Sequence, residues 1–100
     1  SFKIKRFDRA AGMMGAAFTL IVSEYQKEGN FNKANYWLNQ WIAFNDRDIT
    51  AKVAKVKVYL SFPDKRQEGV GLAIDLYRRF PDVRIVSDAY TQAYLFEIKK

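Results

Sequence analysis

The chain has 100 residues, of which 49% are apolar and 16% aromatic, and a formal net charge of +6. This length suits one compact domain over residues 1–100, and the apolar share excludes an intrinsically disordered chain. Cysteine and histidine are both absent. That excludes disulfides, thiolate nucleophiles, the usual zinc ligands and the commonest general base.

The first half of the chain predicts two helices joined by a tight turn. Apolar residues recur at helical spacing in the segment 10–27, and Gly29 follows as a helix-ending glycine. Asn30 can cap the next helix, which should end near residues 45–46. That helix has too many aromatic residues for one face. We therefore expect one or two of them to contact a neighbouring repeat or a partner: Tyr36, Trp37, Trp41 and Phe44.

The segment 48–62 is consistent with either a helix or a strand. Its β-branched residues and its alternation of apolar and polar positions favour a strand. A strand needs a partner, however, and the best candidate is "FKIKRF" near the N-terminus, which would give only a marginal two-stranded ribbon. We therefore expect a helix here.

Two further helices are predicted in the last part of the chain. Pro63 marks a turn, and Asp64 with Gln67 has the spacing of a capping box at the start of the fourth helix. Pro81 should end that helix, and Asp82 can cap the fifth. The predicted fold class is all-α, with about five antiparallel helices. An α+β fold with a small two-stranded ribbon is the alternative.

An internal period supports this organisation. Eight positions of the first helix pair match positions 35 residues later, with apolar or small residues aligned at almost all of them. They are Phe18, Ile21, Val22, Tyr25, Ala34, Leu38, Trp41 and Asp46, matched with Val53, Val56, Lys57, Leu60, Gly69, Ala73, Leu76 and Pro81. A further step of 34 residues places the first four on Ser87, Tyr90, Thr91 and Tyr94.

The pattern resembles the tetratricopeptide repeat. Phe18 occupies the motif's first aromatic position, Tyr25 its tyrosine, Gly29 its turn, Ala34 its small residue and Pro81 its closing proline. The resemblance covers residues 11–100 and implies antiparallel helix-turn-helix repeats stacked as a short right-handed α-solenoid. The chain departs from the motif at four positions: Val22, Lys57, Trp41 and Leu76.

The repeats divide the chain into four parts. Residues 1–10 form a basic N-terminal segment, residues 11–46 the first repeat and residues 47–81 the second. Residues 82–100 are an incomplete third repeat or a capping helix, and their apolar character favours a fragment of a longer array.

The resemblance also implies a binding surface, because the first helices of successive repeats line a concave groove in that family. The candidate partner-binding residues are Thr19, Ser23, Lys27, Ala54, Val58, Phe62, Asp88, Gln92 and Phe96. The alternative is that a neighbouring repeat or a second copy of the chain covers them. The family's carboxylate clamp for chaperone tails is absent, because the matching positions hold Thr19, Ser23, Ile85 and Ala89.

Catalytic and cofactor sites are not indicated. Glu24 and Glu28 have the spacing of a solvated helix face, and Gly69–Gly71 lacks the strand and the Lys-Ser/Thr of a phosphate loop. The serines have no histidine to activate them. We expect no enzyme activity, no cofactor and no metal site.

The expected function is a non-catalytic protein-protein interaction scaffold or adaptor, with another protein or a peptide as its partner and homo-oligomerisation as a further option. A basic helical module that binds nucleic acid is the second interpretation, because "FKIKRF" and "KVAKVKVY" place basic residues near aromatic ones. A small secretion-type chaperone that wraps a partner helix is the third. No apolar run reaches the length of a membrane span.

Overall fold

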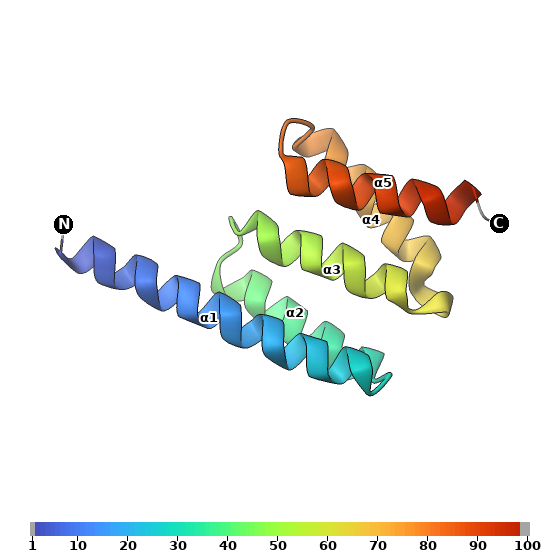
Figure 1. The fold of residues 1–100 in the computed structure, drawn as a ribbon. Coiled ribbons are helices and arrows are strands. Elements are labelled where there is room, and N and C mark those ends of the chain that lie inside the picture. Colours follow the sequence, from blue (N-terminus) through green and yellow to red (C-terminus); the bar gives the residue numbers. More distant parts are fainter. Residues whose placement is uncertain (1, 99–100) are drawn as a thin grey trace. The chain divides into compact units, whose positions relative to one another are not determined.

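The computed structural model describes the backbone of residues 2–98 and the side chains of residues 15–96. This part of the chain is helical and contains no strand (Figure 1). The elements are α1 (Phe2–Lys27), α2 (Phe31–Phe44), α3 (Ile49–Ser61), the short 3₁₀ helix η1 (Pro63–Lys65), α4 (Arg66–Arg79) and α5 (Arg84–Ile98). The all-α prediction is confirmed, and the alternative with a two-stranded ribbon is wrong.

The chain forms two compact units, residues 1–47 and residues 48–100. Their boundary falls beside the expected border between the first and second repeats, at residues 46 and 47. The first unit holds α1 and α2, and the second holds α3, α4 and α5.

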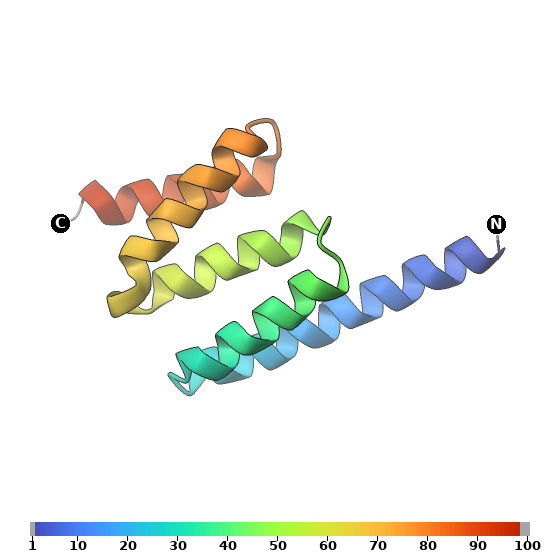
Figure 2. The same ribbon diagram turned by 180° about the vertical axis from the view of Figure 1, so that it is seen from behind.

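In the first unit, α1 and α2 pack as an antiparallel hairpin (Figures 1 and 2). Helix α1 begins at Phe2, well before the expected start at Ala10, and its N-terminal part extends past the end of α2. The segment 1–10 was expected to precede the helix. It contains no proline or glycine and holds good helix formers such as lysine, arginine and alanine, so nothing in it stops the helix from starting early.

The turn between α1 and α2 confirms the predicted capping signals. Gly29 has φ +75°, its N–H donates to Gln26 O at 3.1 Å, and the Asn30 N–H donates to Tyr25 O at 2.9 Å. These two bonds form a Schellman motif with glycine in the left-handed position. The Asn30 side chain then accepts a hydrogen bond from the Lys33 N–H at 3.2 Å and caps α2.

The core of the first unit is a cluster of aromatic rings around Phe18. The ring centroid of Phe18 lies 6.0 Å from that of Trp41 in a stacked arrangement. It lies 6.2 Å from the ring centroid of Phe44 and 6.3 Å from that of Trp37. Trp41 is buried, whereas Tyr36 and Phe44 are 55% and 48% exposed. Two of the five aromatics of α2 thus keep a large exposed surface, as one-sided packing of this helix requires.

The second unit has three helices in contact with one another. Helices α3 and α5 run in the same direction (Figures 1 and 2). Helix α4, which connects them in the sequence, runs back in the other direction. Asp48 caps α3 by accepting from the Thr50 N–H at 3.0 Å. One shared core joins all three helices: Val53, Val56, Leu60, Ala73, Leu76, Val86, Ala89 and Ala93. Segment 48–62 is therefore helical because packing on two helices outweighs its β-branched content.

Two predicted caps in this unit are wrong. Lys65, not Asp64, occupies the N-cap position of α4, and no side chain caps this helix. Asp64 is the middle residue of η1, which begins at Pro63. It therefore lies within a helical turn and not at the residue that precedes α4. Helix α5 begins at Arg84, so Val83 precedes it in place of Asp82. The Val83 carbonyl accepts from the N–H groups of Val86 and Ser87, both at 3.1 Å.

The third repeat also has a different register from the expected one. An offset of 34 residues aligns core residues with Ser87, Tyr90 and Tyr94, but Tyr94 is 56% exposed. The buried residues of α5 are Val86, Ala89 and Ala93, each 33 residues after its counterpart Val53, Val56 or Leu60. Helix α5 is therefore offset by one residue from the expected alignment, and its exposed large apolar residues are Ile85, Tyr94 and Leu95.

Candidate functional site

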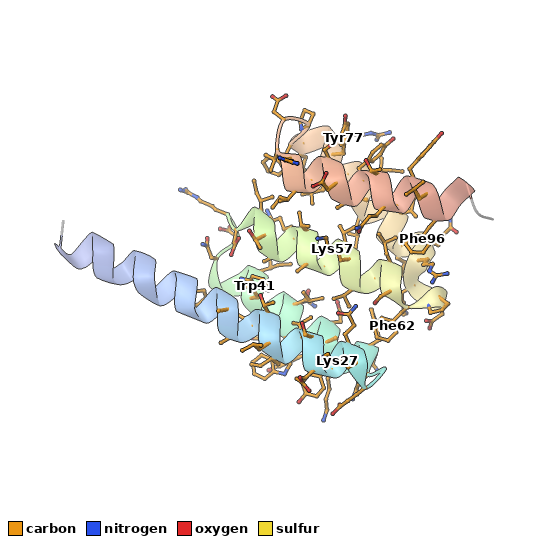
Figure 3. All side chains as sticks on the ribbon, in the orientation of Figure 1. Lys27, Trp41, Lys57, Phe62, Tyr77 and Phe96 are labelled. Carbon is orange, nitrogen blue, oxygen red and sulfur yellow. The ribbon has the colours of Figure 1, made fainter. Side chains whose placement is uncertain are left out.

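A hollow of about 350 Å³ lies between α3 and α5 in the second unit. Both helices contribute residues from their C-terminal halves, which lie side by side because the helices run in the same direction. Figure 3 labels one residue from each side, Lys57 on α3 and Phe96 on α5. The lining residues are Lys57, Leu60, Ser61, Gln92, Leu95 and Phe96.

The lining combines an apolar floor with a polar edge. Leu60 is buried in the core, Leu95 is 50% exposed and Phe96 is half-buried, so apolar surface continues from the core out to solvent. Lys57 and Gln92 are exposed, and Lys57 carries the one charge among the six lining residues. Such a surface can take an apolar side chain and place a polar or charged group beside it.

The C-terminus of α3 shapes one end of the hollow. The last carbonyls of a helix have no partner within the helix and need other donors. Here the Ser61 hydroxyl donates to Val58 O at 2.7 Å, and the Phe62 N–H donates to Tyr59 O at 3.3 Å. The Arg66 Nε–H donates to Leu60 O at 2.9 Å. Arg66, the first residue of α4, is therefore tied back to α3.

Arg66 also contacts the opposite wall. Its guanidinium carbon lies 4.5 Å from the centroid of the Phe96 ring, within cation–π distance. Leu60 and Phe96 both line the hollow, so the guanidinium is held at its border by one hydrogen bond and one ring contact. A positive, planar group is thereby fixed beside an apolar recess.

The possible metal ligands and the ionisable groups with a shifted pKa bear on whether the described residues could support catalysis. These residues include no group of three or more His, Cys, Asp or Glu residues that could hold a metal. The predicted solvated face at Glu24 carries an exposed ion pair with Lys27 at 3.8 Å. Burial raises the pKa of the Tyr59 hydroxyl above 10.0, and the charge of Glu68 adds to the effect. A tyrosine shifted in this direction stays protonated near neutral pH and is not activated as a base.

The nine candidate site residues divide between the two units. Thr19, Ser23 and Lys27 belong to the first unit, where the Thr19 hydroxyl donates to Gly15 O at 2.9 Å within α1. The other six belong to the second unit: Ala54, Val58, Phe62, Asp88, Gln92 and Phe96.

In the second unit, Gln92 and Phe96 line the hollow, and Asp88 is exposed on α5. On α3, Ala54 and Phe62 are half-buried and Val58 is buried, and none of these three lines it.

Sequence reasoning missed four lining residues: Lys57, Leu60, Ser61 and Leu95. One signal pointed to the first of them. Lys57 is the position where the repeat alignment places a charge opposite an apolar residue, and its counterpart Val22 is buried. A charged residue at a repeat position that is otherwise apolar can indicate a residue that is exposed and available for binding.

Comparisons with known protein families, with curated proteins and with solved structures find no match for this chain. Among the residues that the structure describes, no helix is long and apolar enough to cross a membrane.

Proposed function

We propose that this protein is a non-catalytic, tetratricopeptide-like interaction module that binds a peptide segment of another protein in the hollow between α3 and α5. One observation carries the proposal. The first helix of the second repeat and the lone helix of the third enclose an open, largely apolar recess of about 350 Å³. A recess of this size accommodates side chains of a bound segment.

Equivalent burial in the two repeats supports the repeat reading. Ala34 and Gly69 occupy the same repeat position, and both are buried at helix–helix contacts. The same holds for three further pairs: Phe18 with Val53, Leu38 with Ala73 and Trp41 with Leu76. Helix pairs that bury matching positions are the units from which helical-repeat scaffolds are built.

The chemistry of the lining selects the kind of partner. Leu60, Leu95 and Phe96 suit an aliphatic or aromatic side chain, while Gln92 can exchange hydrogen bonds with a peptide backbone. An amphipathic helix or an extended segment with one apolar anchor fits this arrangement.

A second candidate function is nucleic-acid binding, and the charge of α3 favours it. The charged residues of this helix are Lys52, Lys55 and Lys57, with no aspartate or glutamate among them. Lys55, however, lies over the Tyr59 ring, 5.8 Å from its centroid. Binding by phosphate contacts alone would weaken steeply with rising salt, so a titration with single-stranded DNA over a salt series separates this candidate from the first.

Selection from a displayed library of random peptides tests the proposed function. The bait is the wild-type protein, and the enriched peptides are measured again with Leu95→Asp, which places a charge in the apolar lining. Ile85→Asp is the matched control, because Ile85 is a similarly exposed apolar residue of α5 that does not line the hollow. We expect Leu95→Asp to abolish binding and Ile85→Asp to retain it. Failure to enrich any peptide, or equal loss in both variants, would contradict the proposal.

A further inference from the structure

We propose that the segment bound between α3 and α5 carries an acidic side chain next to its apolar anchor, and that Arg66 holds this carboxylate. The inference rests on the proposed function and names the chemistry of its ligand. It starts from the position of Arg66, whose contacts fix the guanidinium at the border of the hollow.

Among the residues that the structure describes, the contacts of Arg66 leave the donors on its two terminal nitrogens unused. A guanidinium has five N–H donors, and the bond to Leu60 O uses the single donor on Nε. The donors on the two terminal nitrogens form a planar fork that matches a carboxylate in a bidentate pair. Among the described residues, Arg66 makes no ion pair, so no carboxylate of this part of the chain occupies the fork.

The contact with Phe96 favours selectivity. The ring centroid lies 4.5 Å from the guanidinium carbon, and this cation–π contact limits the motion of the side chain, which lowers the entropy lost when it binds a carboxylate. Phe96 also lines the hollow, so an apolar side chain packed there lies next to the fork. A ligand with neighbouring apolar and acidic residues can use both contacts at once.

Lys57 adds positive charge to the same recess. It is exposed, it lines the hollow, and it makes no ion pair with any side chain that the structure describes. Helix α3 has no acidic residue to offset it. The recess therefore combines two cationic side chains with an apolar lining, and charge complementarity favours an acidic peptide.

A protein segment fits this site better than a nucleic acid does. Tight binding to a phosphate backbone requires many cationic contacts, whereas the recess offers one lining lysine and one bordering arginine. Its remaining lining is mainly leucine and phenylalanine, which a peptide side chain can cover.

The experiment uses the peptides enriched on the wild-type protein. Each peptide is synthesised twice, with its acidic residues kept or replaced by the corresponding amides, and both affinities are measured by fluorescence anisotropy. We expect the acidic form to bind about tenfold more tightly, as a charge-assisted hydrogen bond predicts. In Arg66→Gln the ratio of the two affinities should fall to the smaller value that Lys57 alone provides, and Arg66→Lys should keep part of the difference.

The ratio of the two affinities does not depend on how much of a variant is folded, because a smaller folded fraction weakens the binding of both peptides equally. Arg78→Gln is the matched control: it removes an exposed arginine of α4 that does not line the hollow, and it should leave the ratio unchanged. Peptides that bind equally well as acids and amides would overturn the carboxylate assignment and leave the proposed function standing. Single-stranded DNA that outcompetes every peptide at physiological salt would overturn the carboxylate assignment and would favour the second candidate function over the proposed one. If no peptide is enriched, the proposed function fails, and this inference with it.

Discussion

Gly69 of α4 lies so close to Leu60 of α3 that a Cβ atom on Gly69 would be 3.1 Å from the Leu60 backbone nitrogen. The same Cβ would lie 3.1 Å from the Tyr59 Cβ. Neither atom can move by a simple side-chain rotation, so the absence of a side chain at Gly69 sets the distance between the two helices. Through this contact Gly69 also positions the C-terminal part of α3, where the hollow is formed.

We expect Gly69→Ala to lower the free energy of unfolding of the second unit by about 1 kcal/mol. Overpacking should cost about 2 kcal/mol, and the higher helix propensity of alanine should offset about 1 kcal/mol of this. Gly71→Ala is the matched control. A Cβ there meets nothing within 4 Å, so the same change should stabilise by roughly 0.5–1 kcal/mol. Urea unfolding followed by far-ultraviolet circular dichroism measures both. Equal effects of the two substitutions would show that the helices are not in tight contact at Gly69.

Local signals in the sequence were enough to locate most of the fold. Gly29 and Asn30 carry their own capping chemistry, and both have the predicted roles. The start of α4 was harder to locate, because Asp64 and Gln67 have the spacing of a capping box but η1 lies before the helix. Whether 48–62 forms a helix or a strand depends on contacts with α4 and α5, which no local pattern encodes.

The candidate site was predictable only in part, because it depends on the rotation of each helix about its axis. Gln92 and Phe96 were identified from the repeat resemblance, and both line the hollow. On α3 the resemblance selected Val58, but the lining comes from the neighbouring face that carries Lys57. The turn at residues 80–83 sets the one-residue difference in register on α5, and such turns do not show in an apolar period.

Gly29→Ala should destabilise the first unit by about 1 kcal/mol, because a left-handed backbone conformation strains a residue with a Cβ atom. The site itself is open, with nothing within 4 Å of a Cβ, so the effect comes from the backbone alone. Gly29→Asn should lose about half as much stability as Gly29→Ala, since asparagine tolerates the left-handed conformation better than alanine does. The protein's two tryptophans, Trp37 and Trp41, both lie in this unit, so their fluorescence during urea unfolding reports on it. Alanine as stable as glycine would contradict the Schellman turn.

Phe18→Ala should destabilise the first unit by about 3–4 kcal/mol, because it removes the ring at the centre of the aromatic cluster. Leu20→Ala is the control on the same helix. Leu20 is 69% exposed, and its truncation should change stability by less than about 0.5 kcal/mol. The stacked contact between Phe18 and Trp41 makes tryptophan fluorescence a direct measurement. A small loss in Phe18→Ala would show that the cluster does not hold α1 against α2.

The shifted pKa of Tyr59 predicts how the free energy of unfolding changes at alkaline pH. Burial in the folded protein, with a contribution from the charge of Glu68, raises the pKa of its hydroxyl above the usual value of 10.0. The folded state therefore keeps this proton at a pH where the unfolded chain has released it. The stabilisation is fully present below pH 10.0 and is lost as the pH rises through the higher folded pKa.

Replacing Tyr59 with phenylalanine removes the titrating group and retains the ring over which Lys55 lies. We expect the wild type to lose stability more steeply than Tyr59→Phe as the pH rises above about 10. The measurement is the urea midpoint of both proteins over an alkaline pH series, with a reference point near neutral pH where Tyr59 is protonated in both states. Since the other titrating groups are common to both proteins, the difference between their slopes isolates Tyr59. Parallel curves would show that its hydroxyl has the same pKa in the folded and unfolded chains, and would contradict the burial of its hydroxyl group.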